Sequence, residues 1–181
     1  TNPLSLFFIW EGGLSFHGGL AGVIVSLYAF SIRQSISFLR LADAICIAIP
    51  IGLGLVRIGN FLNGELYGRA TDGGWGFIFP TDPYGLVRHP SQLYEAFFEG
   101  IVLFFILMWI GSRNQKPGVL SGSFLVGYGL LRFVIEFFRQ PDAHMGFITL
   151  QLSMGQLLSI PMLIIGLILL TKSLRKHEAI S

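Results

Sequence analysis

Long apolar stretches separated by short polar segments run through almost the whole chain. A helix needs roughly 20 residues to cross the hydrocarbon core of a bilayer, and five stretches reach or approach that length. They cover residues 14–32, 41–60, 93–111, 119–138 and 152–170. Pro50 and Pro161 fall inside two of them, but membrane helices tolerate proline where neighbouring groups satisfy the freed carbonyls. The pattern therefore predicts an all-α, polytopic membrane protein with five spans, forming one membrane-embedded domain over residues 1–181.

The composition points to the same lipid environment. Hydrophobic residues make up 52 % of the 181 residues and charged residues only 12 %, whereas a soluble domain carries about 25 % charged residues. A chain of this size in water would still need polar groups to cover its surface, so lipid must contact many of its side chains. The net charge is only +2, and no dense basic run is interleaved with aromatic residues, which argues against nucleic acid as a partner.

Basic residues in the connections orient the predicted spans. They follow the first, third and fifth stretches, as Arg33, Arg40, Arg113, Lys116, Lys172, Arg175 and Lys176. The positive-inside rule makes these connections cytoplasmic, so the N-terminal end of the chain lies outside and the C-terminal end inside. The connection 64–90 then lies on the outer side, although it contains Arg69 and Arg88. Connections of that length usually carry function or lack order.

Ionisable and polar side chains recur near the outer ends of the predicted spans. In the first three spans they are His17, Arg57, Asn60, the run 88–92, Tyr94, Glu95 and Glu99. In the fourth span Tyr128, Arg132 and Glu136 recur every four residues and so share one face of a helix. A charge in hydrocarbon costs at least ~2.5–3.5 kcal/mol, so such groups should face one another or a wet cavity. The pattern predicts a polar site in the outer third of the membrane.

Other interpretations of these residues stay open. Arg132 and Glu136 could form a purely structural ion pair, and Arg57 could extend to the outer interface. A transporter or channel would line a pathway with the same side chains, although the repeated halves typical of transporters are not visible. A non-catalytic scaffold is a third alternative, but it would bear the cost of so many ionisable residues at one depth in the membrane without using them. The four histidines lack the spacing of a metal site, and glycines such as Gly54 and Gly122 indicate close helix packing.

Four blocks of the sequence resemble one known family. They are Ser-Phe-His-Gly-Gly at 15–19, the run 57–69 that begins Arg-Ile-Gly-Asn, the run 88–95 that begins Arg-His-Pro-Ser, and the run 128–142 that begins Tyr-Gly. In this order they resemble the prolipoprotein diacylglyceryl transferases over almost the whole chain. Members of that family usually have seven membrane helices, with the N-terminus outside and the C-terminus inside. The resemblance implies that the five predicted spans are the last five of seven, in a fragment without about the first two, and that 70–87 is shorter than in some members.

The activity that the resemblance implies is the transfer of a diacylglyceryl group from phosphatidylglycerol to the lipobox cysteine of a prolipoprotein signal peptide. A thioether forms and glycerol phosphate leaves, in a bacterial inner membrane and on its outer, periplasmic side. No cofactor, metal or nucleic acid takes part. The residue types suit this chemistry, because a guanidinium fork matches phosphate oxygens and a thiol with a pKa near ~8.5 must lose its proton to attack.

The resemblance and the polar pattern together assign roles to individual residues. Arg57 and Arg132 are expected to hold the phosphate, and His17 is the candidate base for the substrate thiol. The residues expected to orient the arginines or to bind glycerol hydroxyls are Asn60, Glu65 and Glu136. The further candidates for substrate binding are Gly68, His89, Gln92, Tyr128 and Arg139. Cys46 is excluded as a nucleophile, because it falls toward the cytoplasmic half of its span.

Overall fold

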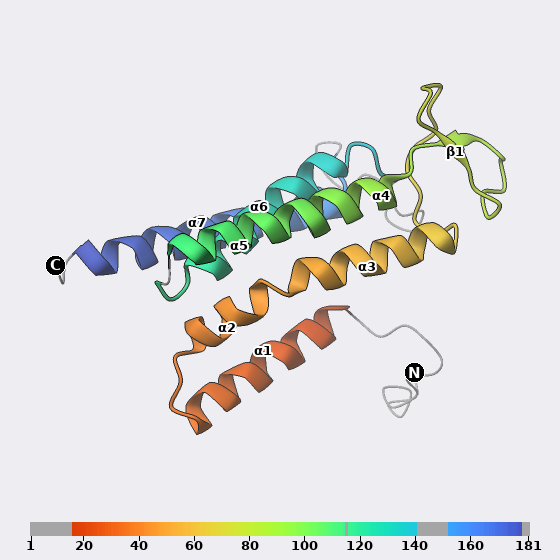
Figure 1. Cartoon of the computed structure of the whole chain (residues 1–181). Helices are drawn as coiled ribbons and strands as arrows, with labels where there is room; N and C mark the ends of the chain where they lie inside the picture. Colours follow the sequence, from red (N-terminus) through yellow and green to blue (C-terminus); the bar gives the residue numbers. More distant parts are fainter. Residues whose placement is uncertain (1–15, 115, 141–151, 179–181) are drawn as a thin grey trace, which may run out of the picture. The chain divides into compact units, whose positions relative to one another are not determined.

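The computed structural model describes residues 16–114, 116–140 and 152–178 (Figure 1). The described chain is mostly helical and forms two compact units that divide between Leu41 and Ala42. Within the described residues, three helical segments are long and apolar enough to cross a membrane, and two shorter helices are also apolar. The long segments are Phe38–Leu62, Ser91–Arg113 and Met154–Arg175, and the shorter ones are Gly18–Arg33 and Val119–Ile135. The prediction of a helical membrane protein is confirmed, while the count of five spans stays a prediction.

The first unit contains α1 (Phe16–Arg33) and the start of α2 (Phe38–Cys46). The tight turn between them places Ser35 in the left-handed region, with a φ of 54°. Tyr28 and Phe38 meet edge to face across this turn, with ring centroids 6.1 Å apart. The helix predicted for the first apolar stretch is therefore confirmed from its third residue onward.

Helices also make up most of the second unit. They are α3 (Ile49–Leu62), α4 (Ser91–Glu95), η3 (Ala96–Val102), α5 (Leu103–Arg113), α6 (Val119–Ile135) and α7 (Met154–Glu178). The helices α4, η3 and α5 follow one another without a break, and η3 is a stretch of π-helix, a form that is frequent at functional sites. Cys46, Leu103, Leu107 and Phe124 pack together as a buried core.

Two predicted helix boundaries differ from the structure. The stretch 41–60 is divided between α2 and α3, and Pro50 lies in the first turn of α3, where its missing N–H leaves no bond unmade. The helix predicted to end at 138 ends at Ile135, because the chain turns there and Arg139 pairs with Gly68 in a β-bridge.

Glycines set the closest contacts between the helices of the second unit. The helix α6 packs along α7 (Figure 1), and a Cβ atom added at Gly122 would lie 3.1 Å from the carbonyl oxygen of Gly166. Where η3 meets α3, a Cβ at Gly100 would lie 2.9 Å from the Cα of Gly54. These distances confirm the packing role predicted for Gly54 and Gly122. A Cβ at Gly52, by contrast, would meet nothing within 4 Å in the described part of the chain.

Asp43, which interrupts the second apolar stretch, caps a helix far along the chain. Its carboxylate accepts hydrogen bonds from the amides of Gly118 and Ser121 at 2.6 and 2.7 Å, and from the Ser121 hydroxyl at 2.5 Å. Gly118 begins α6 with a φ of 91°, a conformation that favours glycine. A carboxylate at a helix N-terminus satisfies amides that otherwise lack partners. Asp43 therefore has a structural role.

The connection between α3 and α4 contains a small β structure at the end of the second unit (Figure 1). Its strands β1 (Phe77–Ile78) and β2 (Val87–Arg88) pair in antiparallel fashion. Isolated β-bridges join Gly68 to Arg139 and Ala70 to Arg88. Backbone pairing between segments far apart in sequence therefore orders this connection, while the described chain stays mostly helical as predicted.

Candidate functional site

Three arginines and three glutamates meet in the second unit, and we call this group the arginine cluster. It consists of Arg57 from α3, Glu95 from α4, Glu99 from η3, Arg132 from α6, and Glu136 and Arg139 just after α6. Glu95 is its fully buried centre. The Oε2 atom of this carboxylate lies 2.7 Å from Nε of Arg57, 2.8 Å from Nη1 of Arg132 and 3.7 Å from Nη1 of Arg139. One anion thus joins segments that are far apart in the sequence.

Arg132 also contacts the other two glutamates. Its Nη2 lies 2.9 Å from Oε2 of Glu136, one helical turn later, and its Nη1 lies 3.9 Å from Oε1 of Glu99. The shared face of Arg132 and Glu136 that the sequence predicts is therefore present in the structure. Arg57 turns toward Glu95 rather than away from the cluster, and its side chain is only 16 % exposed.

Hydrogen bonds do not satisfy every carboxylate oxygen of the cluster. Among the described residues, Oε1 of Glu95 and both oxygens of Glu99 are buried without a hydrogen-bond partner. The Oε2 atom of Glu136 has its ion pair with Arg132 but no hydrogen bond. Because buried polar atoms in proteins nearly always have partners, these oxygens are candidates to accept a hydrogen bond from a hydroxyl donor or to take up a proton.

A line of hydrogen bonds runs from Arg57 to the connection between α3 and α4. Nη1 of Arg57 donates to Oδ1 of Asn60 at 3.3 Å, and Nδ2 of Asn60 donates to Oε1 of Glu65 at 3.1 Å. The Asn63 side chain also donates to Glu65, and these amide donors lower the pKa of the Glu65 carboxyl below its usual value. Gln92 donates to the backbone carbonyl of Glu65 at 2.7 Å. The predicted site residues Asn60, Glu65 and Gln92 are therefore joined to the cluster through Arg57 and to one another.

Three other predicted site residues have supporting positions. A Cβ atom at Gly68 would lie 2.5 Å from the carbonyl oxygen of Phe138 and 2.6 Å from that of His89, so only glycine fits where these backbones meet. The His89 ring packs edge-on against Phe138, with centroids 5.5 Å apart, and its Nδ1 lies 3.3 Å from the hydroxyl of Tyr94. Tyr128 stacks on a phenylalanine of the core, with ring centroids 5.7 Å apart. The contacts of Gly68 and His89 fix the connection between α3 and α4 against the segment after α6, while Tyr128 packs against the buried core.

Two residues mark where the sequence prediction and the structure diverge. His17 lies in the first turn of α1, but its side chain is outside the described residues, so its role stays a prediction. Glu95 is absent from the predicted site residues, although it is the centre of the cluster. A signal for it exists, because Glu95 and Glu99 lie one helical turn apart in an apolar stretch and so need cationic partners on one face.

A second buried ion pair, the outer ion pair, lies in the connection between α3 and α4. The carboxylate of Asp82 accepts two hydrogen bonds from Arg88, at 2.7 Å from Nε and 3.0 Å from Nη2. It also accepts the backbone amide of Leu86 at 3.0 Å. The hydrogen bonds from Arg88 lower the pKa of Asp82 from its usual value of 3.8 to about 2. The same guanidinium lies over the ring of Tyr67, 4.8 Å from its centroid, so this pair fixes the fold of the connection.

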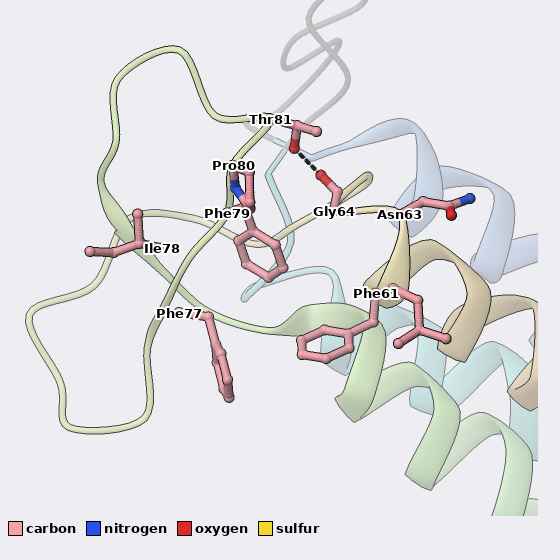
Figure 2. Close-up of a pocket in the computed structure, with 9 residues that line it drawn as sticks. Phe61, Asn63, Gly64, Phe77, Ile78, Phe79, Pro80 and Thr81 are labelled. Carbon is pink, nitrogen blue, oxygen red and sulfur yellow. Dashed lines mark hydrogen bonds between the residues drawn. The ribbon is translucent and has the colours of Figure 1, made fainter.

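A small pocket lies between the end of α3 and the loop that carries β1 (Figure 2). Its volume is about 210 Å³, and its lining includes Phe61, Phe77 and Phe79. The Thr81 hydroxyl donates to the carbonyl of Gly64, as the dashed line in Figure 2 shows. Among the described residues, no ionisable side chain lines this pocket. The arginine cluster, by contrast, brings six ionisable side chains together.

The fold and the arginine cluster define a class, namely α-helical membrane proteins with a buried site of arginines and glutamates. Comparison with protein families gives the particular family. The family model described as prolipoprotein diacylglyceryl transferase matches residues 1–172, and the chain belongs to this family.

Individual relatives agree with this assignment, and all three below are named phosphatidylglycerol–prolipoprotein diacylglyceryl transferase. The protein of Idiomarina loihiensis is 50 % identical over 172 residues, which cover 95 % of this chain and 64 % of the relative. That of Geobacter sulfurreducens is 56 % identical, with 92 % of this chain and 64 % of the relative covered. That of Pseudoalteromonas atlantica is 53 % identical, with 98 % and 65 % covered. The chain therefore spans 64 to 65 % of the length of these relatives.

Proposed function

We propose that the protein containing this chain transfers the diacylglyceryl group of phosphatidylglycerol to the cysteine thiol in the lipobox of prolipoproteins. The observation that carries the proposal is the convergence of Arg57, Arg132 and Arg139 on a single oxygen of Glu95 within an apolar helical protein. Arginine suits a phosphodiester because its planar fork matches two phosphate oxygens. The names of the relatives supply the two substrates.

The cluster would act mainly on the leaving group. The substrate sulfur attacks the diacylglyceryl carbon that is bonded to a phosphate oxygen, so a C–S bond forms and the C–O bond breaks. Glycerol phosphate leaves with the electron pair and gains negative charge. A guanidinium has five N–H donors, and the ion pairs and hydrogen bonds of Arg57 and Arg132 leave some of them for this oxygen. Fixed positive charge at that point stabilises the transition state more than the ground state.

The other predicted site residues would support these two steps. His17 is proposed as the base that accepts the thiol proton, since a neutral imidazole can take up a proton near neutral pH. Asn60, Glu65 and Gln92 would hold Arg57 in position through the hydrogen bonds described above. Glycerol hydroxyls of the headgroup would donate to the buried oxygens of Glu95 and Glu99 that lack partners among the described residues. Tyr128, Arg139, His89 and Gly68 would complete the surroundings of the substrate.

We propose further that all five apolar helices cross a bacterial inner membrane, with residues 64–90 on the periplasmic side. The basic connections on the opposite side support this orientation. A Cys46→Ala background with a cysteine introduced at Asp72 or at Ser112, both exposed, tests it. In intact spheroplasts a membrane-impermeant thiol reagent should label the cysteine at 72 and spare the one at 112. The reverse pattern would overturn the orientation.

The transfer itself is tested with the full-length protein, phosphatidylglycerol and a lipobox peptide. The expected result is a peptide that gains the mass of one diacylglyceryl group on its cysteine. A peptide in which serine replaces that cysteine should gain nothing. A transporter or channel would move a solute and leave the peptide mass unchanged, and this outcome would contradict the proposed function.

A further inference from the structure

The charge balance of the arginine cluster depends on how many of its carboxyl groups are ionised. With every side chain ionised, three positive and three negative charges cancel. A phosphodiester brings one more negative charge into a site where water screens charge poorly. A proton taken up by one carboxylate would cancel this excess, and a buried charge without compensation is costly enough to favour that uptake.

Glu99 is the carboxylate that the cluster compensates least. Its side chain is 1 % exposed, and its ion-pair contact with Nη1 of Arg132 is 3.9 Å long. Neither of its oxygens has a hydrogen-bond partner among the described residues. Glu95 and Glu136 each have an arginine nitrogen within 2.9 Å. Protonation of Glu99 therefore loses less electrostatic attraction to the arginines than protonation of Glu95 or Glu136 would.

The groups around Glu99 come from the helices packed on η3 and from the segment after α6. They are Arg57 of α3, Glu95 of α4, Tyr128 and Arg132 of α6, and Glu136 and Arg139 beyond it. The arginine of α5, Arg113, lies at the far end of that helix. Arginine and tyrosine do not change charge near neutral pH, so among these described groups the proton goes to one of the three carboxylates. The contacts above favour Glu99.

We propose that Glu99 takes up a proton when the arginine cluster binds the phosphodiester of a phospholipid, so that lipid binding and protonation are coupled. The inference rests on the proposed function in one respect, since it takes a phosphodiester to be the ligand. Coupling between two ligands is reciprocal, so the affinity for the lipid falls as pH rises through the range in which the complex holds the extra proton. For one proton the fall is at most about tenfold per pH unit.

The test is a titration of the full-length protein with phosphatidylglycerol at several values between about pH 5 and about pH 9. Wild-type affinity should fall as pH rises. Glu99→Gln is neutral at every pH, so its affinity should match that of wild type at the acid end and stay level. Glu99→Asp keeps a titratable group and should keep the dependence. Glu136→Gln is the matched control, because it removes a carboxylate of the same cluster and should change the affinity without removing the dependence on pH.

Equal pH dependence in wild type and Glu99→Gln would overturn the inference, as would a level profile in wild type. Loss of the pH dependence of affinity in Glu136→Gln would assign the proton to Glu136. That outcome would overturn the inference even if Glu99→Gln fails to fold. His17 is present in every variant, so it does not affect the differences between them. Transfer to a lipobox peptide, measured on the same samples, separates the two proposals. Thioether formation with a level wild-type profile refutes only the coupling, whereas sloped binding without thioether formation refutes only the transfer.

Discussion

In the outer ion pair Asp82 and Arg88 face each other one to one, whereas in the arginine cluster one oxygen of Glu95 serves three arginines. Each oxygen of Asp82 accepts one hydrogen bond from the guanidinium and one from a backbone amide. In the cluster, carboxylate oxygens of Glu95 and Glu99 stay without hydrogen-bond partners among the described residues. Residue types alone therefore do not distinguish a structural ion pair from a functional site. In a structural ion pair the partners use one another's hydrogen-bonding groups fully. In a site, some of these groups stay without partners and can bind a ligand.

The largest expected effect on transfer comes from a residue outside both the arginine cluster and the outer ion pair. His17→Gln keeps a polar side chain but cannot accept a proton near neutral pH. Transfer at about pH 7 should fall roughly 100-fold, the lower range for loss of a general base, and should recover in part toward about pH 9, where the thiolate forms unaided. Phosphatidylglycerol binding should change little. An equal loss at every pH, with weaker lipid binding, would give His17 a headgroup-positioning role instead.

Removing the centre of the cluster should have the next largest effect. Glu95→Gln leaves three guanidinium groups without their shared anion, so they should repel one another and lose their geometry. Transfer should fall at least about 30-fold, which corresponds to ~2 kcal/mol at the transition state. The measurement is the rate of thioether formation by the full-length variant in detergent, beside Asp82→Asn as a control that neutralises a buried carboxylate outside the cluster. Transfer within twofold of wild type would remove Glu95 from the site.

A smaller loss of transfer activity is expected when lysine replaces arginine, because lysine keeps the positive charge but lacks the planar guanidinium. Arg132→Lys has one ammonium point charge in place of two parallel donors, so it should lower transfer about tenfold, or ~1.4 kcal/mol. Arg57→Lys should behave alike, because both guanidiniums contact the same oxygen of Glu95. Activity within twofold of wild type at normal expression would mean that Arg132 and Glu136 form only a structural ion pair.

The smallest effect on transfer is expected in the outer ion pair. Asp82→Asn should change transfer less than twofold but lower the melting temperature at neutral pH. Because the folded-state pKa of Asp82 is depressed to about 2, the pair stabilises the fold fully above the ordinary pKa of 3.8 and loses that effect as pH falls toward 2. The melting temperatures of wild type and variant should therefore converge over this window. A difference that persists at the acid end would contradict the role of the ionised carboxylate.

The parts of the fold that depend on local periodicity could be predicted from the sequence. The helices follow from apolar stretches, and the shared faces of Arg57 with Asn60 and of Arg132 with Glu136 follow from spacings of three and four residues. The contact of Glu95 with arginines of α3 and α6 has no such spacing, because helices that are distant in sequence supply the partners. The two-residue strands are too short to give an alternating pattern.

Long-range structure also changes the meaning of two residues. Gly68 is a predicted site residue, and the structure adds a packing reason for glycine there, because a side chain would meet the carbonyls of His89 and Phe138. Asp43 resembles an interruption of a span until its bonds to the amides that begin α6 are known. In both cases the deciding neighbours are at least about 20 residues away, beyond the reach of a local pattern.

The most direct test of the central claim compares phosphatidylglycerol affinity in Arg132→Lys and Arg88→Lys of the full-length protein. Each variant removes one guanidinium fork from a buried ion pair, one in the arginine cluster and one in the outer ion pair. If the cluster is the phosphate site, Arg132→Lys should weaken binding about tenfold and Arg88→Lys less than twofold. Equal losses in the two variants, or a larger loss in Arg88→Lys, would contradict the assignment of the lipid phosphate to the arginine cluster.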